Sequence, residues 1–236
     1  CMNPEFLREG SAVSDFLEPD RIVIGEWDAR SGQVLDELYQ DFDCPRLHTS
    51  LANAELVKYT SNALLATLIS FSNEIASLCE KIPGSDVETV MEGLHLDQRL
   101  SPTVNGQRVS PGILHYLRAG SGFGGSCLPK DVNALRSFGQ KLKLKTPLLD
   151  AVMRINQRRT AEVLRLLEKR IGKLRGHTVT VLGLAFKPET DDLRESPAVR
   201  MIHELLKKGA KVRAYDPVAI RSAKEIFDSK LTLKDK

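Results

Sequence analysis

The chain has 236 residues, with 34 Lys and Arg against 31 Asp and Glu, so its formal net charge is +3. Hydrophobic residues make up 42% and charged residues 28%, a balance that excludes a disordered chain, a collagen and a disulfide scaffold. So small a net charge gives no indication of nucleic acid or a membrane surface as a partner. The length allows one or two domains with a sizeable core.

Cysteine spacing and the lack of long apolar runs set further limits. The four cysteines form no CxxC pair, and the five histidines have no ligand spacing, so we expect neither a metal site nor disulfides. No apolar run reaches the roughly 18 residues of a membrane helix, and the first ten residues do not resemble a signal peptide. We therefore expect a cytoplasmic protein. The chain does not begin with Met and ends in a charged tail, so both ends are expected to be cut.

Residues 1–50 are predicted to be the last part of an α/β domain. Residues 21–26 (RIVIGE) have the pattern of a buried strand, residues 31–42 that of a helix, and residues 44–50 that of a short strand or loop. The preceding segment NPEFLREG offers Glu5 and Glu9 at helical spacing. A carboxylate there could activate water, and a capped surface turn is the alternative.

A single long helix is predicted over residues 52–79, which contain no glycine or proline and repeat apolar residues every three or four positions. Lys58 and Asn62 are four residues apart and so share one face of it. An ammonium and an amide aimed at one point can stabilise an oxyanion, whereas a lone lysine is more often solvated. Residues 83–85 (PGS) are predicted to end this helix and cap the next.

The glycine-rich stretch 101–126 is predicted to be a long functional loop, because it contains six glycines and two prolines. It leads into residues 122–131 (GFGGSCLPKD), where Cys127 precedes a helix predicted to begin near Asp131. A helix N-terminus and the nearby Lys130 both favour a thiolate, and hence a nucleophile. A packed, unreactive cysteine is the alternative.

Helical patterns continue to about residue 171, with a break at 145–147. A strand is then predicted at 178–184, a helix at 196–208 and a second strand at 211–216, which together indicate a parallel, doubly wound sheet. The helix has Ser196 as its N-cap and Pro197 at its first position.

The loop 183–196 (GLAFKPETDDLRES) follows the first of these strands, where doubly wound domains bind phosphates. Lys187 and Arg194 could contact phosphate oxygens. Because GLAFKP is not GxGxxG, the loop does not by itself indicate a dinucleotide site.

The order NPEFLREG, KYTSNA, GFGGSCLPKD, GLAFKPETDDLRESPA resembles the UDP-glucose/GDP-mannose dehydrogenase family, and most closely its members that oxidise UDP-glucose. The resemblance implies an α/β chain with three parts. These are a Rossmann-domain remnant ending the NAD-binding domain, a central all-helical dimerisation domain with a long helix, and a partial Rossmann-like UDP-sugar-binding domain, at residues 1–50, 51–171 and 172–236. It also implies a homodimer.

The activity implied by the resemblance is a four-electron, NAD-dependent oxidation of UDP-glucose to UDP-glucuronate through a cysteine thiohemiacetal and thioester. Cys127 would be the nucleophile, Lys58 and Asn62 would hold the C6 oxygen, Asp131 would assist proton transfer, and Glu5 would activate water.

The resemblance also implies binding residues. The sugar-nucleotide site would include Leu7, Gly122, Phe123, Lys130, Phe186 and Lys187. Arg194 would approach the cofactor, and Arg99 would reach the partner subunit's site.

Some features depart from the family pattern and leave alternatives open. Most of the NAD-binding domain precedes the elements seen here, so the 236 residues alone are expected to be inactive. The loop 101–121 is longer than usual for the family. The alternatives are a GDP-mannose or UDP-N-acetylmannosamine dehydrogenase, a non-catalytic dimerisation or nucleotide-sugar-binding module, and an acyltransferase, which would need a histidine near Cys127.

Overall fold

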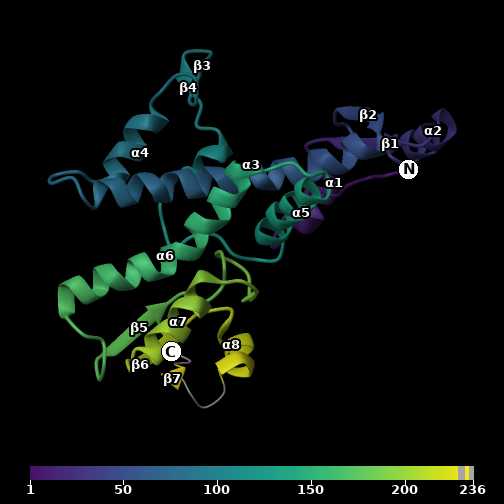
Figure 1. Ribbon diagram of the computed structural model, residues 1–236. Coiled ribbons are helices and arrows are strands. Elements are labelled where there is room, and N and C mark those ends of the chain that lie inside the picture. The colour runs from purple at the N-terminus through teal and green to yellow at the C-terminus, as the bar shows by residue number, and fades with distance from the viewer. Residues whose placement is uncertain (228–231, 234–236) are drawn as a thin grey trace. The chain divides into compact units, whose positions relative to one another are not determined.

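A computed structural model describes residues 1–227 and 232–233 (Figure 1). The chain divides into two compact units, residues 1–62 and residues 63–236. The mixed α/β class expected from the sequence is confirmed, with small parallel sheets early and late in the chain and helices in its centre. No helix within the described residues is long and apolar enough to cross a bilayer.

The first unit is a strand–helix–strand structure, and residues 44–50, expected to be a short strand or loop, contain strand β2 (Arg46–Ser50). Strands β1 and β2 pair in parallel, with Ile22 opposite Arg46 and Glu26 opposite Ser50. Asp28 caps the intervening helix by accepting a hydrogen bond from the Ser31 N–H (2.7 Å). The elements are α1 (Ala12–Leu17), β1 (Ile22–Glu26), α2 (Ala29–Leu38), β2 (Arg46–Ser50) and the start of α3 (Leu51–Cys79).

The N-terminal segment is not helical, so the helical spacing assigned to Glu5 and Glu9 is wrong. Met2 instead forms an antiparallel bridge to Gly25, with N–H···O bonds of 2.8 and 2.7 Å in the two directions. This bridge draws the segment along β1. It requires a glycine at the contact, since a Cβ on Gly25 would lie 2.7 Å from the Cβ of Ala54 and 3.0 Å from the Met2 carbonyl oxygen.

The long helix is confirmed as α3, which has 29 residues. The next helix is α4 (Val87–His95), and its cap is Asp86, not the preceding serine. The Asp86 carboxylate accepts from the Thr89 N–H at 2.9 Å.

The predicted loop 101–126 contains local structure of its own. An antiparallel hairpin pairs β3 (Thr103–Val104) with β4 (Gln107–Arg108). Its turn is Asn105–Gly106, where both residues have positive φ (50° and 76°), as Asn-Gly hairpin turns require. A 3-10 helix, η1 (Gly112–Tyr116), follows. The centre is thus helical in its main elements and carries this hairpin in addition.

Helices α5 (Cys127–Lys141) and α6 (Pro147–Ile171) are separated by the expected break. The prediction that α5 begins near Asp131 is wrong, because the helix begins at Cys127 itself. Pro129 is tolerated in the first turn, where its missing N–H would have no helical partner in any case.

The C-terminal part is the predicted parallel unit, with strand order β5-β6-β7. The Ser196 hydroxyl accepts from the Ala198 N–H (3.2 Å) and donates to the Leu184 carbonyl (2.6 Å), so this cap also ties α7 to the loop after β5. The core here includes Leu184, Ile202 and Leu205, all fully buried. The elements are β5 (Thr178–Leu182), α7 (Pro197–Lys207), β6 (Lys211–Tyr215), α8 (Ile220–Phe227) and β7 (Thr232–Leu233).

Candidate functional site

The thiol of Cys127 is exposed at the first residue of α5. The positive end of a helix dipole and the free N–H groups of a first turn stabilise a negative charge at such a position. The Ser126 hydroxyl lies 3.6 Å from the Cys127 sulfur. An exposed sulfur in this place has the access and the electrostatic surroundings that a nucleophile needs.

Asp131 is one helical turn after Cys127 and therefore lies on the same face of α5. Its carboxylate is buried, and one of its oxygens is 2.9 Å from the Lys130 ammonium. A thiol, an ammonium and a carboxylate are thus gathered within the first five residues of one helix.

The glycines before Cys127 pack directly against the loop 183–196. A Cβ on Gly124 would lie 2.4 Å from the Glu195 carbonyl oxygen, and one on Gly125 would lie 2.8 Å from the Phe186 ring. The Gly125 N–H donates to the Arg194 carbonyl at 2.8 Å. The structure therefore brings two of the predicted motifs into contact, although they are about 60 residues apart.

Within the loop 183–196, charged side chains are held near the contact with the cysteine loop. The Lys187 ammonium lies 5.6 Å from the centre of the Phe186 ring. The Arg194 guanidinium pairs with Asp192, through bonds of 2.9 Å from Nε and 2.8 Å from Nη2. Arg194 is exposed and Lys187 is partly buried, so both cations are open to an anionic ligand.

A single buried carboxylate, that of Asp216, fixes the start of this loop. It accepts hydrogen bonds from the N–H groups of Leu184 (2.7 Å), Ala185 (3.2 Å), Val218 (2.8 Å) and Ala219 (2.7 Å). Burial alone would raise the pKa of Asp216, but these four donors outweigh it and the pKa is lowered.

The first unit gathers a second set of predicted residues. The Lys58 ammonium donates to the Glu5 carbonyl at 2.6 Å and lies 3.1 Å from the Glu5 carboxylate. Asn62 is one turn further along α3. The N–H of Leu7 donates to the other Glu5 carboxylate oxygen at 2.7 Å. The structure therefore brings the Lys58 ammonium to the Glu5 carboxylate, and the helical spacing places Asn62 on the same face of α3 as Lys58.

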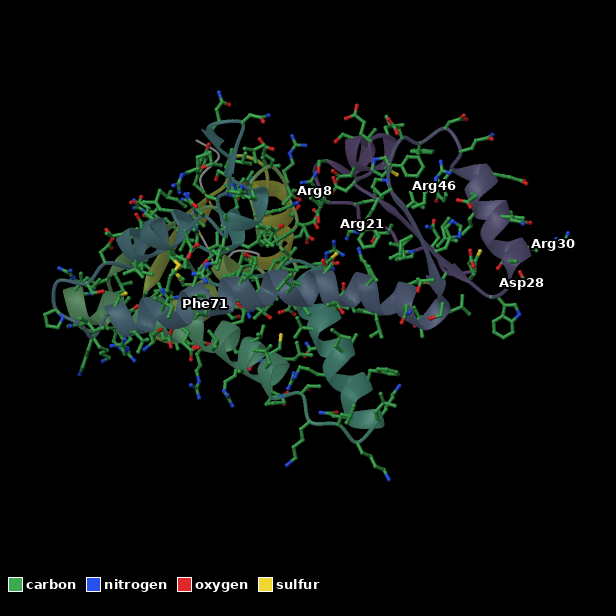
Figure 2. The ribbon with its side chains drawn as sticks, turned by 90° about the horizontal axis from the view of Figure 1, so that it is seen from above. Arg8, Arg21, Asp28, Arg30, Arg46 and Phe71 are labelled. Carbon is green, nitrogen blue, oxygen red and sulfur yellow. The ribbon has the colours of Figure 1, made fainter. Side chains whose placement is uncertain are left out.

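A cavity of about 210 Å³ lies beside this segment and is lined by Glu5, Leu7, Arg8 and Arg21, among others. The guanidinium of Arg21 stacks 4.0 Å from the centre of the Phe6 ring. Figure 2 shows Arg8 and Arg21 near each other in the first unit. The predicted site residues thus form two groups, one in each unit.

Arg99 follows α4 and stands apart from both groups in its contacts. Its exposed side chain pairs with Asp97, at 3.0 Å from Nε, and this contact lowers the pKa of Asp97 to about 2. The described residues contain no cluster of three or more His, Cys, Asp or Glu side chains arranged to hold a metal ion.

Sequence reasoning missed the buried polar side chains that hold the cysteine loop, chiefly Asn73, Asn156 and Arg159. The sequence feature that could have indicated them is a polar residue on the apolar face of a predicted helix. Sequence reasoning also missed that Gly120, Gly122 and Gly125 have the Gly-x-Gly-x-x-Gly spacing. The 3-10 helix η1 and a loop precede them in place of a strand, so the context of a dinucleotide fingerprint is not met.

Rossmann-like α/β units early and late in the chain, linked through a helical centre that carries an exposed cysteine, are the architecture of multidomain dehydrogenases. Three models of one family match in order: its NAD binding domain over residues 1–43, its central domain over 52–158 and its UDP binding domain over 180–236. The chain belongs to the UDP-glucose/GDP-mannose dehydrogenase family.

Similar proteins have names that agree with this family. The chain is 41% identical to UDP-glucose 6-dehydrogenase YwqF of Bacillus subtilis, over 99% of this chain and 50% of that protein. It is 43% identical to UDP-glucose 6-dehydrogenase TuaD of the same organism, over 95% and 46%. A solved UDP-glucose dehydrogenase from Pyrobaculum islandicum is similar at a TM-score of 0.90 and 45% identity, over 99% and 51%. The chain spans about half the length of the curated relatives it matches.

Proposed function

We propose that the whole protein containing this chain oxidises UDP-glucose to UDP-glucuronate with NAD as the oxidant. The observation that carries the proposal is the exposed cysteine at the first residue of α5. Gly124 and Gly125, just before it, pack against the loop 183–196 of the segment that matches the UDP binding model. The names of the relatives support the same substrate. We also propose the domain division 1–50, 51–171 and 172–236.

Residues 1–50 fit the NAD-binding domain only as its closing elements. They supply a parallel β1–β2 pair with α2 between the strands, but no strand–glycine turn–helix that could cradle a pyrophosphate among the described residues. NAD supplies a hydride acceptor, used twice. We assign only Arg194 of this chain to its neighbourhood, and no step below depends on a cofactor geometry.

The chain's own residues account for the remaining chemistry. Lys58 and Asn62 hold the C6 oxygen and stabilise its anionic forms. After the first oxidation, the Cys127 sulfur adds to the aldehyde carbon, and the second oxidation leaves a thioester.

Thioester hydrolysis completes the reaction. Glu5 takes a proton from water, the water oxygen bonds to C6, and the C–S bond breaks with its electron pair returning to sulfur. Asp131 assists the proton transfers at that sulfur. Two hydrides and three protons leave in all, matching one alcohol and one water consumed.

The substrate is bound from several segments. Leu7, Gly122, Phe123 and Lys130 line the sugar site. Phe186 and Lys187 contact the nucleotide, with the Lys187 ammonium directed to phosphate oxygens.

We also propose a homodimer that forms through the central domain. Apolar residues on α3 and just beyond it alternate at spacings of four and three, which is the seam pattern of paired helices. Leu64, Phe71, Leu78 and Ile82 of this seam are exposed, and Figure 2 shows Phe71 on the long helix. The seam comprises Leu64, Leu68, Phe71, Ile75, Leu78 and Ile82. In the dimer, Arg99 reaches the partner's substrate site. We place this dimer in the cytoplasm, where free thiols stay reduced.

The test is NADH production by the purified whole protein with UDP-glucose, GDP-mannose and UDP-N-acetylmannosamine in parallel. We expect two NADH for each UDP-glucose consumed and at least about tenfold lower kcat/KM for the other two sugars. A preference for another sugar would overturn the substrate assignment. This comparison is needed because a UDP-D-ManNAc dehydrogenase from Pyrococcus horikoshii is also similar, at a TM-score of 0.74 and 29% identity.

For the 236 residues alone, a non-catalytic role is the second candidate, because the chain spans only half of its relatives. Calorimetric titration with UDP-glucose, together with light scattering, separates the two roles. Dimerisation without binding of UDP-glucose indicates a scaffold, and binding indicates a substrate module.

A further inference from the structure

Three buried polar side chains on α3 and α6 all bond to the backbone that leads to Cys127. Asn73, Asn156 and Arg159 are only 1%, 2% and 7% exposed. Burying an amide or a guanidinium is unfavourable unless it is hydrogen-bonded, and an apolar side chain would fill the same space at less cost. What these three groups have in common is the segment 120–123.

Asn156 on α6 binds the backbone of Phe123 at both of its polar atoms. The Asn156 Oδ1 accepts from the Phe123 N–H at 2.8 Å, and its Nδ2 donates to the Phe123 carbonyl at 3.0 Å. The same carbonyl accepts from Arg200 of α7 at 3.2 Å. The fit is close, since a Cβ on the neighbouring Gly122 would lie 2.4 Å from the Asn156 Oδ1.

Gly120 is held in the same manner from two helices. Its N–H donates to Asn73 Oδ1 of α3 at 2.8 Å, and its carbonyl accepts from Arg159 Nε of α6 at 2.6 Å. Arg159 is itself fixed by carboxylates of Glu80 (3.4 Å) and Glu162 (3.2 Å). All the backbone polar groups of Gly120 and Phe123 are therefore paired with buried side chains.

Cys127 begins its helix four residues after Phe123, so the segment 120–123 sets where the sulfur stands. We propose that Asn156, Asn73 and Arg159 are positioning residues, which hold the Cys127 sulfur at the helix N-terminus and at the reacting carbon. The inference rests on the proposed function only in taking Cys127 as the nucleophile. A purely structural role would instead affect stability alone.

The test compares Asn156→Ala with a matched control, Thr160→Ala, in the whole protein. Thr160 is buried on the same helix one turn later, and its hydroxyl has no hydrogen-bond partner among the described residues. Two readouts are needed beside thermal melting. One is the rate of iodoacetamide modification at Cys127, followed by mass spectrometry of the tryptic peptide 119–130. The other is kcat and KM with UDP-glucose.

We expect Asn156→Ala to slow the modification of Cys127 by about two- to fivefold, since the sulfur loses its place at the helix terminus. We expect kcat to fall about 100-fold with KM changed by less than about threefold, because misplacement of a reacting group acts on the chemical step. Thr160→Ala should leave the modification rate and kcat unchanged, even if it lowers the melting temperature as much.

Two results would overturn the proposal: equal melting changes in both variants with modification rate and kcat unaltered, or an Asn156→Ala effect confined to KM. If Asn156→Ala does not fold, Arg159→Lys applies the same test at Gly120. A lysine keeps the charge beside Glu80 and Glu162 but has no Nε–H for the Gly120 carbonyl. Because alkylation needs no substrate, it decides the positioning role even if no nucleotide sugar is oxidised and the proposed function fails.

Discussion

The segments that carry the proposed nucleophile and the proposed water-activating carboxylate are held in opposite ways. Residues 120–127 are bonded by buried side chains from α3 and α6 and by a partly buried arginine from α7, and they pack on the loop 183–196. Glu5 is exposed, and residues 3–8 are held by Lys58 bonding to Glu5, by Asn3 donating to the Val23 carbonyl and by the Met2–Gly25 bridge before them. The difference follows from the chemistry: a nucleophile must meet one carbon in one geometry, whereas a general base must admit water.

The largest expected effect is at the nucleophile. Cys127→Ala in the whole protein should abolish acid formation to below detection, because no thioester can form. Product analysis by mass spectrometry after incubation with UDP-glucose and NAD measures this. Cys44→Ala, at another free cysteine, should keep normal activity. Acid formation by Cys127→Ala at the normal rate would contradict the proposed mechanism through a Cys127 thioester.

Glu5→Gln sharpens the comparison at the exposed segment. It should slow thioester hydrolysis by about 100-fold, in the range that general bases contribute, while the first oxidation persists. The enzyme should then accumulate a covalent adduct on the peptide carrying Cys127, visible by intact-mass measurement. Glu9→Gln serves as the matched control in the same segment. If Glu5→Gln turns over at the wild-type rate without an adduct, another group activates water.

Asp216→Ala tests whether buried anchoring matters for stability. Four N–H groups lose their acceptor, so we expect a loss of about 2 kcal/mol in the free energy of unfolding, measured with urea at pH 7. Asp191→Ala removes an exposed carboxylate with one 3.3 Å hydroxyl contact and should cost far less. Equal losses of unfolding free energy in the two variants would show that the buried hydrogen bonds of Asp216 do not matter for stability.

The same residue predicts a pH dependence. Because the pKa of Asp216 is lowered from 3.8 in the folded chain, its stabilisation is fully present above that value and is lost as the pH falls through the lower, folded-state pKa. Asp216→Ala should remove this component of acid unfolding.

The smallest effect is expected at His48, an exposed anchor of the first unit. The Glu26 carboxylate, followed by that of Asp36, raises the pKa of His48 above 6.5. The stabilisation of the folded state by protonated His48 is therefore complete below pH 6.5 and is lost as the pH rises through the raised pKa. After solvent screening we expect only about 0.5 kcal/mol. The difference between the urea unfolding midpoints at pH 6 and pH 9 should be smaller for His48→Gln than for the parent chain. The control variant His115→Gln should behave like the parent. Arg46, 3.7 Å from Asp36, is unchanged in all three.

Local patterns in the sequence predicted much of this fold. The long helix, the parallel strand pairs and the Ser196–Pro197 start of α7 follow from periodicity and capping within a few residues. Features that depend on distant partners were not predictable. Glu5 and Glu9 have helical spacing, yet the bridge to Gly25 extends the chain. α5 begins at Cys127, four residues earlier than expected.

For the candidate site, the motifs indicated the candidate residues but not how the cysteine loop is held. Asn156 looked like one more polar position on a helix, and only the fold brings it to Phe123, 33 residues earlier. The contact between the Phe186 ring and Gly125 is of the same kind. Such pairings depend on tertiary packing, which leaves no trace in local spacing.

α3 is a single helix of 29 residues, roughly 44 Å long, so the rotation of each residue about its axis is fixed relative to the others. Successive residues are rotated by about 100° around the helix axis. Leu64, where the seam starts, is six residues after Lys58, so the two lie about 120° apart around that axis. One residue added or removed between them would rotate Lys58, the proposed catalytic lysine, by about 100° relative to the proposed dimer seam while α3 stays helical. If Lys58 and the seam have the proposed roles, the number of residues between Lys58 and Leu64 constrains function as much as their identity does.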